Sequence, residues 1–164
     1  MQMDSNIDIE RDHLLDYLSQ YSLAISEKHR LERRLSQIRW DMTHLHGRRL
    51  QDVTMGRAGR DKREGGGTAL VIKADEIERR IIEQTSAACD ALLCIFDIMD
   101  YLPILSIERT VLEMRYIDLY PWALISKKVE ISRSRLFDYH NAGIDLLRLV
   151  PEISIKVARY IGGT

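Results

Sequence analysis

The chain has 164 residues, of which 45% are hydrophobic and 30% are charged, and its formal net charge is −1. This composition predicts a folded protein with one domain of ordinary size, or a small domain on a long helical arm. It argues against a protein coated in basic charge, so binding of nucleic acid would have to use a local basic patch.

The two cysteines and the N-terminus indicate the compartment. Cys89 and Cys94 lie five residues apart in an apolar helical run, where we expect buried, reduced thiols. The acidic start MQMDSNIDIERD lacks the basic and apolar regions of a signal peptide. The sequence has no uninterrupted run of about 18 apolar residues, so we expect no transmembrane span. We therefore expect a cytoplasmic protein without a membrane partner.

Residues 10–46 are predicted to form one long helix. Its apolar residues recur at steps of four and three, with a slip in phase at Lys28: Leu14, Leu18, Tyr21 and Ile25, then Leu31, Leu35, Ile38, Met42 and Leu45. This spacing is typical of a coiled-coil-like seam. The helix also has a basic face that either contacts phosphate or is simply solvated: Lys28, Arg30, Arg33, Arg34 and Arg39.

Residues 47–68 are predicted to form a mobile basic loop. They contain six glycines and six basic residues against three acidic ones, and no periodicity. Four basic residues here are candidates for non-specific phosphate contacts: Arg57, Arg60, Lys62 and Arg63. The alternative is that the loop is only a solubilising linker.

A second long helix is predicted over residues 70–101. Its seam is broken only at Gln84: Leu70, Ala74, Ile77, Ile81, Ala88, Ala91, Ile95 and Ile98. Two helices of similar length around a glycine-rich loop predict an antiparallel hairpin over residues 1–102, which we expect to act as an oligomerisation arm. The end of the second helix is apolar nearly all round, which predicts that the C-terminal module, a second subunit, or both cover it.

Residues 103–150 are predicted to form a helix-turn-helix module of three short helices. Pro103 ends the second long helix, Ser106 is a good N-cap for the next one, Pro121 starts another, and Ser132 caps the last. Pro151 begins a tail, residues 151–164, that could form a short amphipathic helix. No strand pattern is present, so the predicted fold class is all-α: a long antiparallel helical hairpin followed by a helix-turn-helix.

The helix-turn-helix has the residue types that DNA reading requires. Apolar residues occupy the positions where its helices should cross: Ile125, Val129, Leu136, Tyr139, Ile144 and Leu147. Candidate DNA contacts are Ser132, Arg133, Ser134, Arg135 and Asp138 on the open face of the last helix, with Lys127 and Lys128 placed for phosphate. Arginine can bond guanine through two hydrogen bonds. The alternative is a helical subdomain with incidental arginines, or one that contacts only protein.

The segment SIERTVLEMRYIDLYPWALISKKVEISRSRLFDYHNAGIDLLR, residues 106–148, resembles the fourth conserved region of sigma-70-type factors. The matching residues are Glu108, Arg109, Val111, Leu112, Arg115, Tyr116, Trp122, Ile125, Ile131, Ser132, Arg133, Ser134, Ile144, Leu147 and Arg148. The resemblance implies a module that binds the promoter −35 element, with Arg133, Ser134 and Asp138 facing bases. In layout the whole chain is similar to phage-encoded late transcription regulators of the RinA/ArpU type, which implies the cytoplasm of a bacterial host and a contact with host RNA polymerase.

The chain departs from the sigma pattern at several positions. Glu130 stands where the turn usually has glycine, and Leu119 and Pro121 replace the glycine and the capping serine before the tryptophan. A left-handed turn at Glu130 would cost roughly 1 kcal/mol. Ser126 replaces a small alanine at the helix crossing, and Gly143, where alanine is common, is expected to loosen the last helix.

We find no enzyme signature and no cofactor or metal site in the sequence. The carboxylates form no placeable acid–base pair, no nucleophile motif occurs, and the glycine loop lacks the lysine–serine end of a phosphate cradle. A metal set of His44 and His46 with Cys89 and Cys94 lacks suitable spacing.

Together with these resemblances, the sequence predicts a phage-type transcription regulator that activates late genes and binds double-stranded DNA as a dimer or larger oligomer. The resemblance also implies that it contacts RNA polymerase. A complete sigma factor is not expected, because residues 1–102 lack the aromatic and basic cluster that opening the −10 element needs. The alternative is a small terminase-like DNA-packaging or structural adaptor. A third possibility is a factor that captures RNA polymerase without touching DNA.

Overall fold

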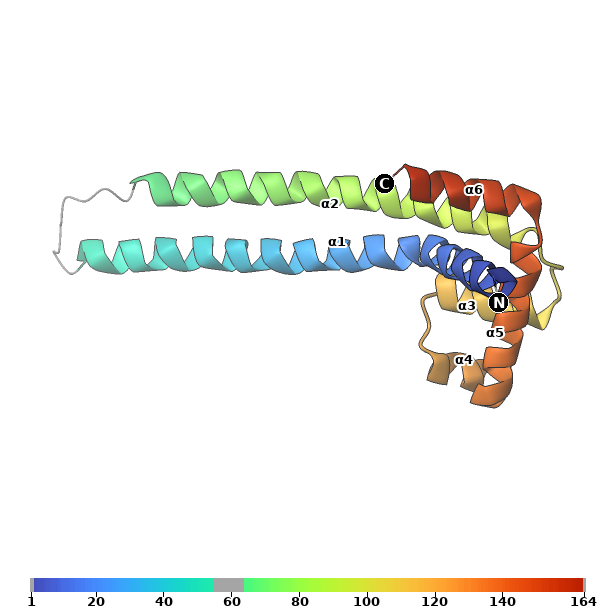
Figure 1. Ribbon diagram of the computed structural model, residues 1–164. Coiled ribbons are helices and arrows are strands. Elements are labelled where there is room, and N and C mark those ends of the chain that lie inside the picture. The colour runs from blue at the N-terminus through green and yellow to red at the C-terminus, as the bar shows by residue number, and fades with distance from the viewer. Residues whose placement is uncertain (1, 55–63, 164) are drawn as a thin grey trace. The chain divides into compact units, whose positions relative to one another are not determined.

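The structure is a computed structural model that describes residues 2–54 and 64–163, and side-chain environments over 7–44 and 67–163. Over the described residues it consists of helices without any strand, which confirms the all-α class (Figure 1). The helices are α1 (Gln2–Thr54), α2 (Glu64–Met99), α3 (Ile107–Tyr116), α4 (Trp122–Val129), α5 (Arg133–Arg148) and α6 (Pro151–Gly162).

Both long helices extend further than the sequence predicted. The prediction of a loop over 47–68 is wrong for residues 47–54 and 64–68, which belong to α1 and α2, and its remaining part lies outside the described residues. The stretch after Gly47 is rich in arginine, leucine and glutamine, which are good helix formers. The three glycines at 65–67 lie in the first turn of α2, where a helix end is least dependent on its own hydrogen bonds.

The chain forms two compact units: residues 1–23 with 87–164 make unit 1, and residues 24–86 make unit 2. These units divide the chain differently from the predicted boundaries after residues 102 and 150. The reason is that the start of α1 and the end of α2 share a core with the C-terminal helices.

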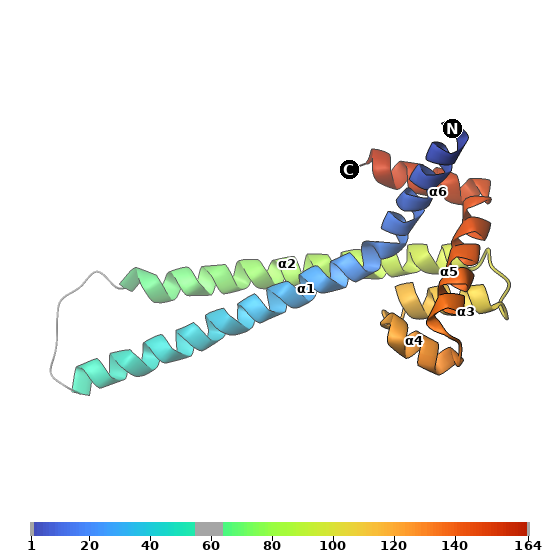
Figure 2. The same ribbon diagram turned by 60° about the horizontal axis from the view of Figure 1, so that its bottom comes forward.

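The main core of unit 1 draws on five helices. Leu14 and Leu18 of α1, Ile95 and Ile98 of α2, and Leu112 of α3 are all fully or almost fully buried. Helices α5 and α6 complete this core with Ile144, Leu147, Ile153 and Val157. The predicted need for cover at the end of α2 is thus met in part by the C-terminal helices, and the tail is the helix α6 (Figure 2).

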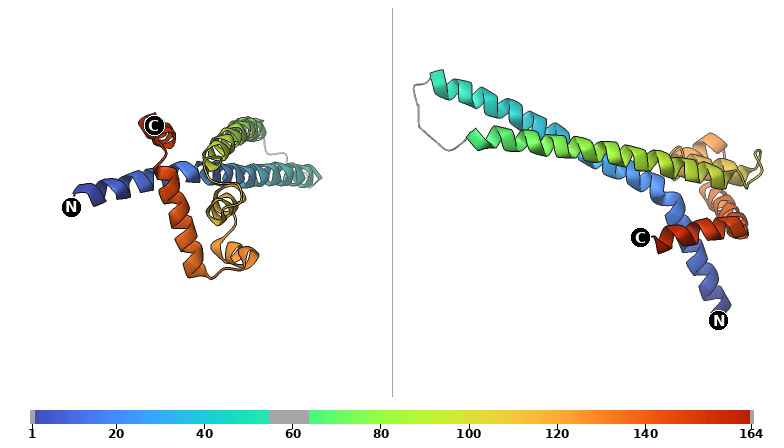
Figure 3. Two further views of the ribbon diagram at one scale, coloured as in Figure 1. Left: turned by 90° about the vertical axis from the view of Figure 1, so that its right-hand side faces the viewer. Right: turned by 90° about the horizontal axis from the view of Figure 1, so that it is seen from above.

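A second cluster in unit 1 joins α3, α4 and α5 around fully buried Val111, Ile125 and Leu136. The left view of Figure 3 shows these three helices grouped, with α6 leading off from the end of α5. At Gly143 the backbone of α5 approaches α3 so closely that an added Cβ would lie 2.9 Å from Leu112 Cδ1 and 3.2 Å from Glu108 Cβ. Gly143 therefore serves close helix packing, which corrects the expectation that it only loosens α5.

Unit 2 contains α1 from Ala24 to its C-terminal end and α2 as far as Ser86, and these two segments run antiparallel and side by side (Figures 1 and 3). Their shared cluster contains Leu35, Ile38 and Ala74, each about 8% exposed, with half-buried flanking residues Met42, Leu70, Ile77 and Ile81. Arg39 donates to the Glu78 carboxylate at 2.7 Å across the pair. Most of the predicted seam positions therefore face the other helix.

The cysteines are only partly as expected. Both are free thiols, but Cys89 is exposed and Cys94 is half-buried, so the expectation of two buried thiols is wrong for Cys89. The reason is that the core covers the face of α2 that carries Ala88, Ala91 and Ile95, whereas Cys89 lies on the adjoining face.

We predict that Leu18→Ala lowers the free energy of unfolding by about 2–5 kcal/mol, because a fully buried leucine leaves a cavity. The matched control is Leu23→Ala five residues later, where 62% of the residue is exposed and a change below about 0.5 kcal/mol is expected. Urea titration followed by far-UV circular dichroism measures both. Equal effects would show that residues 1–23 are not part of this core.

Candidate nucleic-acid interface

Helices α4 and α5 are joined by a turn of three residues, Glu130, Ile131 and Ser132. Glu130 adopts a left-handed conformation with φ 58° and ψ 36°, although it stands where the sigma pattern has glycine. The turn is held to α4 by Ser126, whose carbonyl accepts from the Ile131 N–H at 3.1 Å. The Ser126 hydroxyl donates to the Ile131 carbonyl at 2.5 Å, a bond that alanine at this position could not make.

Two predicted N-caps are confirmed. The Ser106 hydroxyl accepts from the Arg109 N–H at 3.1 Å at the start of α3, and the Ser132 hydroxyl accepts from the Arg135 N–H at 3.4 Å at the start of α5. Pro121 precedes α4 and makes no side-chain cap, as the loss of the usual serine implied. Ser132 therefore fixes where α5 begins and which residues occupy its first turn.

All seven predicted DNA-contact residues are exposed, and they occupy the end of α4, the turn and the first two turns of α5. They are Lys127, Lys128, Ser132, Arg133, Ser134, Arg135 and Asp138. The predicted crossing residues lie on the other side, where Ile125, Leu136, Ile144 and Leu147 are fully buried. Because the face of α5 that carries Leu136, Ile144 and Leu147 is buried, Ser132, Arg133 and Arg135 face solvent.

The basic side chains of unit 1 differ in their partners according to location. Four of them, on the helices that form the main core, are paired with carboxylates: Arg11 with Asp145, Arg109 with Asp100 and Glu113, Arg148 with Glu10, and Lys156 with Asp97. Those around α4 and the turn have no carboxylate partner among the described residues: Arg115, Lys127, Lys128, Arg133 and Arg135. Three acids, Asp118, Glu130 and Asp138, lie in the same segment. On α6, Arg159 is also exposed without a carboxylate partner among the described residues, so five of the six unpaired lysines and arginines of unit 1 lie around α4 and the turn.

Two of these cations rest on aromatic rings. The Arg115 guanidinium lies 4.9 Å from the centre of the Trp122 ring and donates to the Tyr120 carbonyl at 3.2 Å. The Lys128 ammonium lies 5.1 Å from the centre of the Tyr120 ring. Such contacts hold a cation without neutralising it. The sequence prediction left Arg115 out of the interface, although it had matched both Arg115 and Trp122 to the sigma pattern.

A chain of polar contacts, buried at Tyr116 and His140 and exposed at Asn141, connects α5 to α3 and α1. His140 is 7% exposed, and its Nε2 lies 3.0 Å from the Tyr116 hydroxyl, while its Nδ1 lies 3.3 Å from Asn141 Oδ1. Arg11 donates to the same Asn141 oxygen at 2.5 Å. Because that oxygen can only accept, Nδ1 carries the proton and Nε2 accepts from Tyr116. This chain has no counterpart in the sequence prediction, since a lone histidine in a helix gives no sign of its partners.

Burial sets the protonation of this chain. It lowers the pKa of His140, and the nearby Arg11 and Arg115 charges act in the same direction, against the opposite effect of the bond to Asn141. Burial also raises the pKa of Tyr116 to about 12. Both groups are therefore neutral near pH 7. The Trp122 ring packs edge-on against His140, with ring centres 5.1 Å apart.

The remaining predicted contacts fall elsewhere. Arg57, Arg60, Lys62 and Arg63 lie outside the residues whose side chains the structure describes. On the basic face of α1, Lys28, Arg30 and Arg39 are paired with carboxylates, which leaves Arg33 and Arg34. Over the described side chains, no three His, Cys, Asp or Glu residues gather closely enough to hold a metal ion.

Comparisons with known protein families, with curated proteins and with solved structures gave no significant match. Within the described ranges, the helices include none with the length and apolar character needed to span a membrane.

We predict that Glu130→Gly raises the free energy of unfolding by roughly 0.5–1 kcal/mol, because glycine adopts the left-handed conformation without a Cβ penalty. Glu130→Ala is the control, since it removes the same charge but keeps the Cβ. Urea titration compares the three proteins. If the alanine variant is as stable as the glycine variant, the increase in the free energy of unfolding comes from removing the Glu130 charge rather than from relieving backbone strain.

We predict that the stability of the protein falls as pH drops below the ordinary pKa of histidine, about 6.5. Folding lowers the pKa of His140, so below that value the unfolded chain binds a proton that the folded chain does not, and acid favours unfolding. His140→Gln keeps a polar side chain that does not titrate and should show a shallower loss between about pH 7.5 and pH 5.5. The free energy of unfolding is measured by urea titration at each pH. An equal dependence on pH in the two proteins would contradict the assignment to His140.

Proposed function

We propose that the chain is a transcription regulator of the phage late-gene type, which binds promoter DNA through α4, the turn at Glu130 and α5. In this proposal α5 enters the major groove, with Arg133, Ser134, Arg135 and Asp138 toward base edges and Ser132 at the start of the helix. Lys127 and Lys128 contact phosphate, and Arg115 adds to this set.

The observation that carries the proposal is the set of unpaired cations on this edge. Elsewhere in unit 1 the arginines that touch the core are neutralised by carboxylates, whereas Arg133 and Arg135 are exposed and unpaired among the described residues. A guanidinium left free in the first turn of an exposed helix can bond guanine O6 and N7 together, at about 1–3 kcal/mol of discrimination per good pair. The two aromatic supports hold Arg115 and Lys128 in place for phosphate.

The backbone gives separate support to the resemblance on which the proposal draws. Among the described residues, the non-glycine residues with positive φ are Leu119, at 56°, and Glu130, at 58°. Both stand at positions where the sigma pattern has glycine. A left-handed conformation costs roughly 1 kcal/mol for such residues, so its presence at these two positions is difficult to explain as coincidence.

The proposal extends to partners through the resemblance alone. We expect a contact with host RNA polymerase and an activating role upstream of the promoter. A dimer or larger oligomer is expected as well, because a single helix-turn-helix rarely supplies enough affinity.

The test begins with selection of a preferred duplex from a random pool, followed by binding of that duplex and a scrambled one over a salt series. We predict that Arg133→Ala/Arg135→Ala loses about 10-fold or more of the discrimination between the two duplexes. The slope of log affinity against log salt concentration should change by no more than the loss of about two phosphate contacts would cause. Fluorescence anisotropy gives both quantities from one set of titrations.

The matched control is Arg34→Ala/Lys73→Ala in unit 2, which removes the same charge from two exposed, unpaired positions. It should keep the full discrimination. The proposal of sequence-specific DNA recognition would be wrong if selection yields no preferred duplex. It would also be wrong if the wild type binds both duplexes equally. A ring-shaped oligomer without sequence preference would instead favour a packaging adaptor, and the absence of any DNA binding would favour a factor that contacts only polymerase.

A further inference from the structure

The outer face of α1 in unit 2, turned away from α2, carries an unusual side chain. Trp40 is 57% exposed, although it is the largest side chain of this unit. Its ring is stacked on His44 with centres 3.6 Å apart, so it is held in position before any partner arrives. Tryptophan is enriched at the centres of protein interfaces, where a large rigid ring is buried at little entropic cost.

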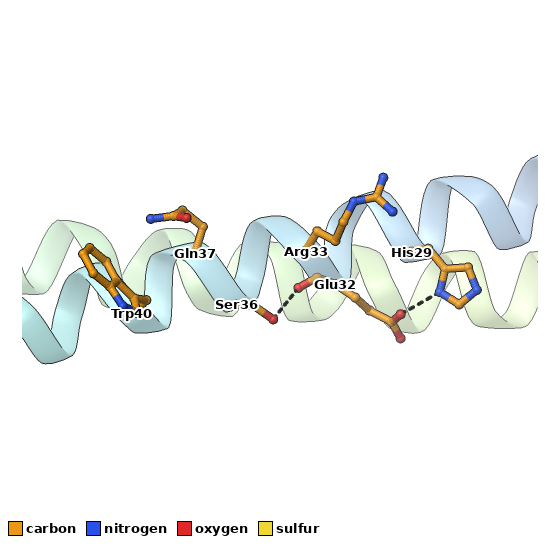
Figure 4. Close-up of a pocket in the computed structure, with 6 residues that line it drawn as sticks. All are labelled: His29, Glu32, Arg33, Ser36, Gln37 and Trp40. Atoms are coloured by element: carbon orange, nitrogen blue, oxygen red, sulfur yellow. Dashed lines mark hydrogen bonds and ion pairs between the residues drawn. The ribbon is translucent and has the colours of Figure 1, made fainter.

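Trp40 stands at one end of an open groove of about 600 Å³. The groove is lined by His29, Glu32, Arg33, Ser36, Gln37 and Trp40, all from α1. Figure 4 shows these residues in a row along the helix, with His29 and Trp40 at opposite ends. The Glu32 carboxylate accepts from His29 Nδ1 at 3.0 Å, and the Ser36 hydroxyl donates to the Glu32 carbonyl at 3.0 Å.

The positions of these six residues are symmetric along the helix. A two-fold axis that lies beside α1, level with the midpoint between residues 34 and 35, would place 29 of one copy opposite 40 of the other, 32 opposite 37, and 33 opposite 36. A closed dimer requires this property, because each copy must present the same patch to the other. The row also follows the four–three spacing of an antiparallel helix seam at 29, 33, 36 and 40.

We propose that this groove is the contact surface for a second copy of the chain, whose α1 packs antiparallel across it. The Trp40 ring of each copy then covers His29 of the second copy, and Gln37 lies opposite Glu32. Arg33 lies opposite Ser36 and one helical turn, about 6 Å, from Glu32 of the second copy, within reach of an arginine side chain. Every contact occurs twice.

Charge favours a second copy over nucleic acid at this face. Glu32, which is 3.8 Å from Lys28 and 3.0 Å from His29 Nδ1, brings a negative charge to the face beside Arg33, so the face carries both signs of charge rather than basic charge alone. The neighbouring Arg30 is already held by Glu27 at 2.6 Å and 2.7 Å. A polyanion would meet Glu32 and Glu27, whereas a second copy brings an arginine to each Glu32.

The experiment measures molar mass by light scattering from about 1 to 200 µM without DNA, so that its outcome is independent of DNA binding. Wild type should pass from monomer to dimer within this range, and Trp40→Ala should shift the midpoint at least 10-fold to higher concentration. Ile72→Ala removes a similarly exposed apolar side chain from α2 and should leave the midpoint unchanged. In Trp122→Phe, the emission of the remaining Trp40 should move to shorter wavelength as the dimer forms.

Charge exchange tests the antiparallel pairing. Arg33→Glu makes the face acidic and Glu32→Arg makes it basic, so each variant should dimerise more weakly than wild type, while an equimolar mixture should recover a dimer. A protein that stays monomeric throughout, or a dimer that Trp40→Ala does not weaken, overturns the proposal. A mixture no tighter than its components overturns the antiparallel contact.

Discussion

The arrangement of unit 1 depends on the burial of one face of α5 along its whole length. Leu136 enters the cluster shared with α3 and α4, while Ile144 and Leu147 enter the core formed with α1, α2 and α6. A rigid helix anchored in two places has no freedom to rotate about its axis. The side chains on its opposite face are thereby fixed in solvent, and in the first turn these are Arg133 and Arg135. Packing at the far end of the helix therefore determines what its beginning can present to a partner.

That burial explains several features that look unfavourable when taken alone. Gly143 weakens a helix locally, but it permits α5 to lie against Leu112 and Glu108. Leu119 and Glu130 store backbone strain, which persists only where the surrounding structure over-determines the conformation. Here the turn is fixed by the Ser126 bonds on one side and the Ser132 cap on the other. Local cost is tolerated because the cores on both sides of the turn are well packed.

Much of the fold could be predicted because its signals are local. Ser106 and Ser132 act as the predicted caps, and the four–three spacing found the inward faces of both long helices. The partners of those faces depend on long-range packing, which periodicity does not contain. Leu14 was therefore assigned to the same arm as Leu35, although Leu14 packs with α5 and α6 in unit 1. His140 and its bond to Tyr116 were missed for the same reason, since the two residues lie 24 positions apart.

The balance of charge connects the two proposals. At physiological salt, exposed charges act over about 8–10 Å, so the net charge of −1 says little about any one edge of the protein. Along residues 115–138 five basic side chains are opposed by Asp118, Glu130 and Asp138, which leaves a modest positive excess. In the proposed complex, an edge with this excess would release few counterions from DNA and would bind weakly as a single copy. Linking two copies makes the second binding event intramolecular and multiplies affinity without any new DNA contact. A self-complementary face on α1 supplies that link without using any residue of the proposed DNA-binding edge.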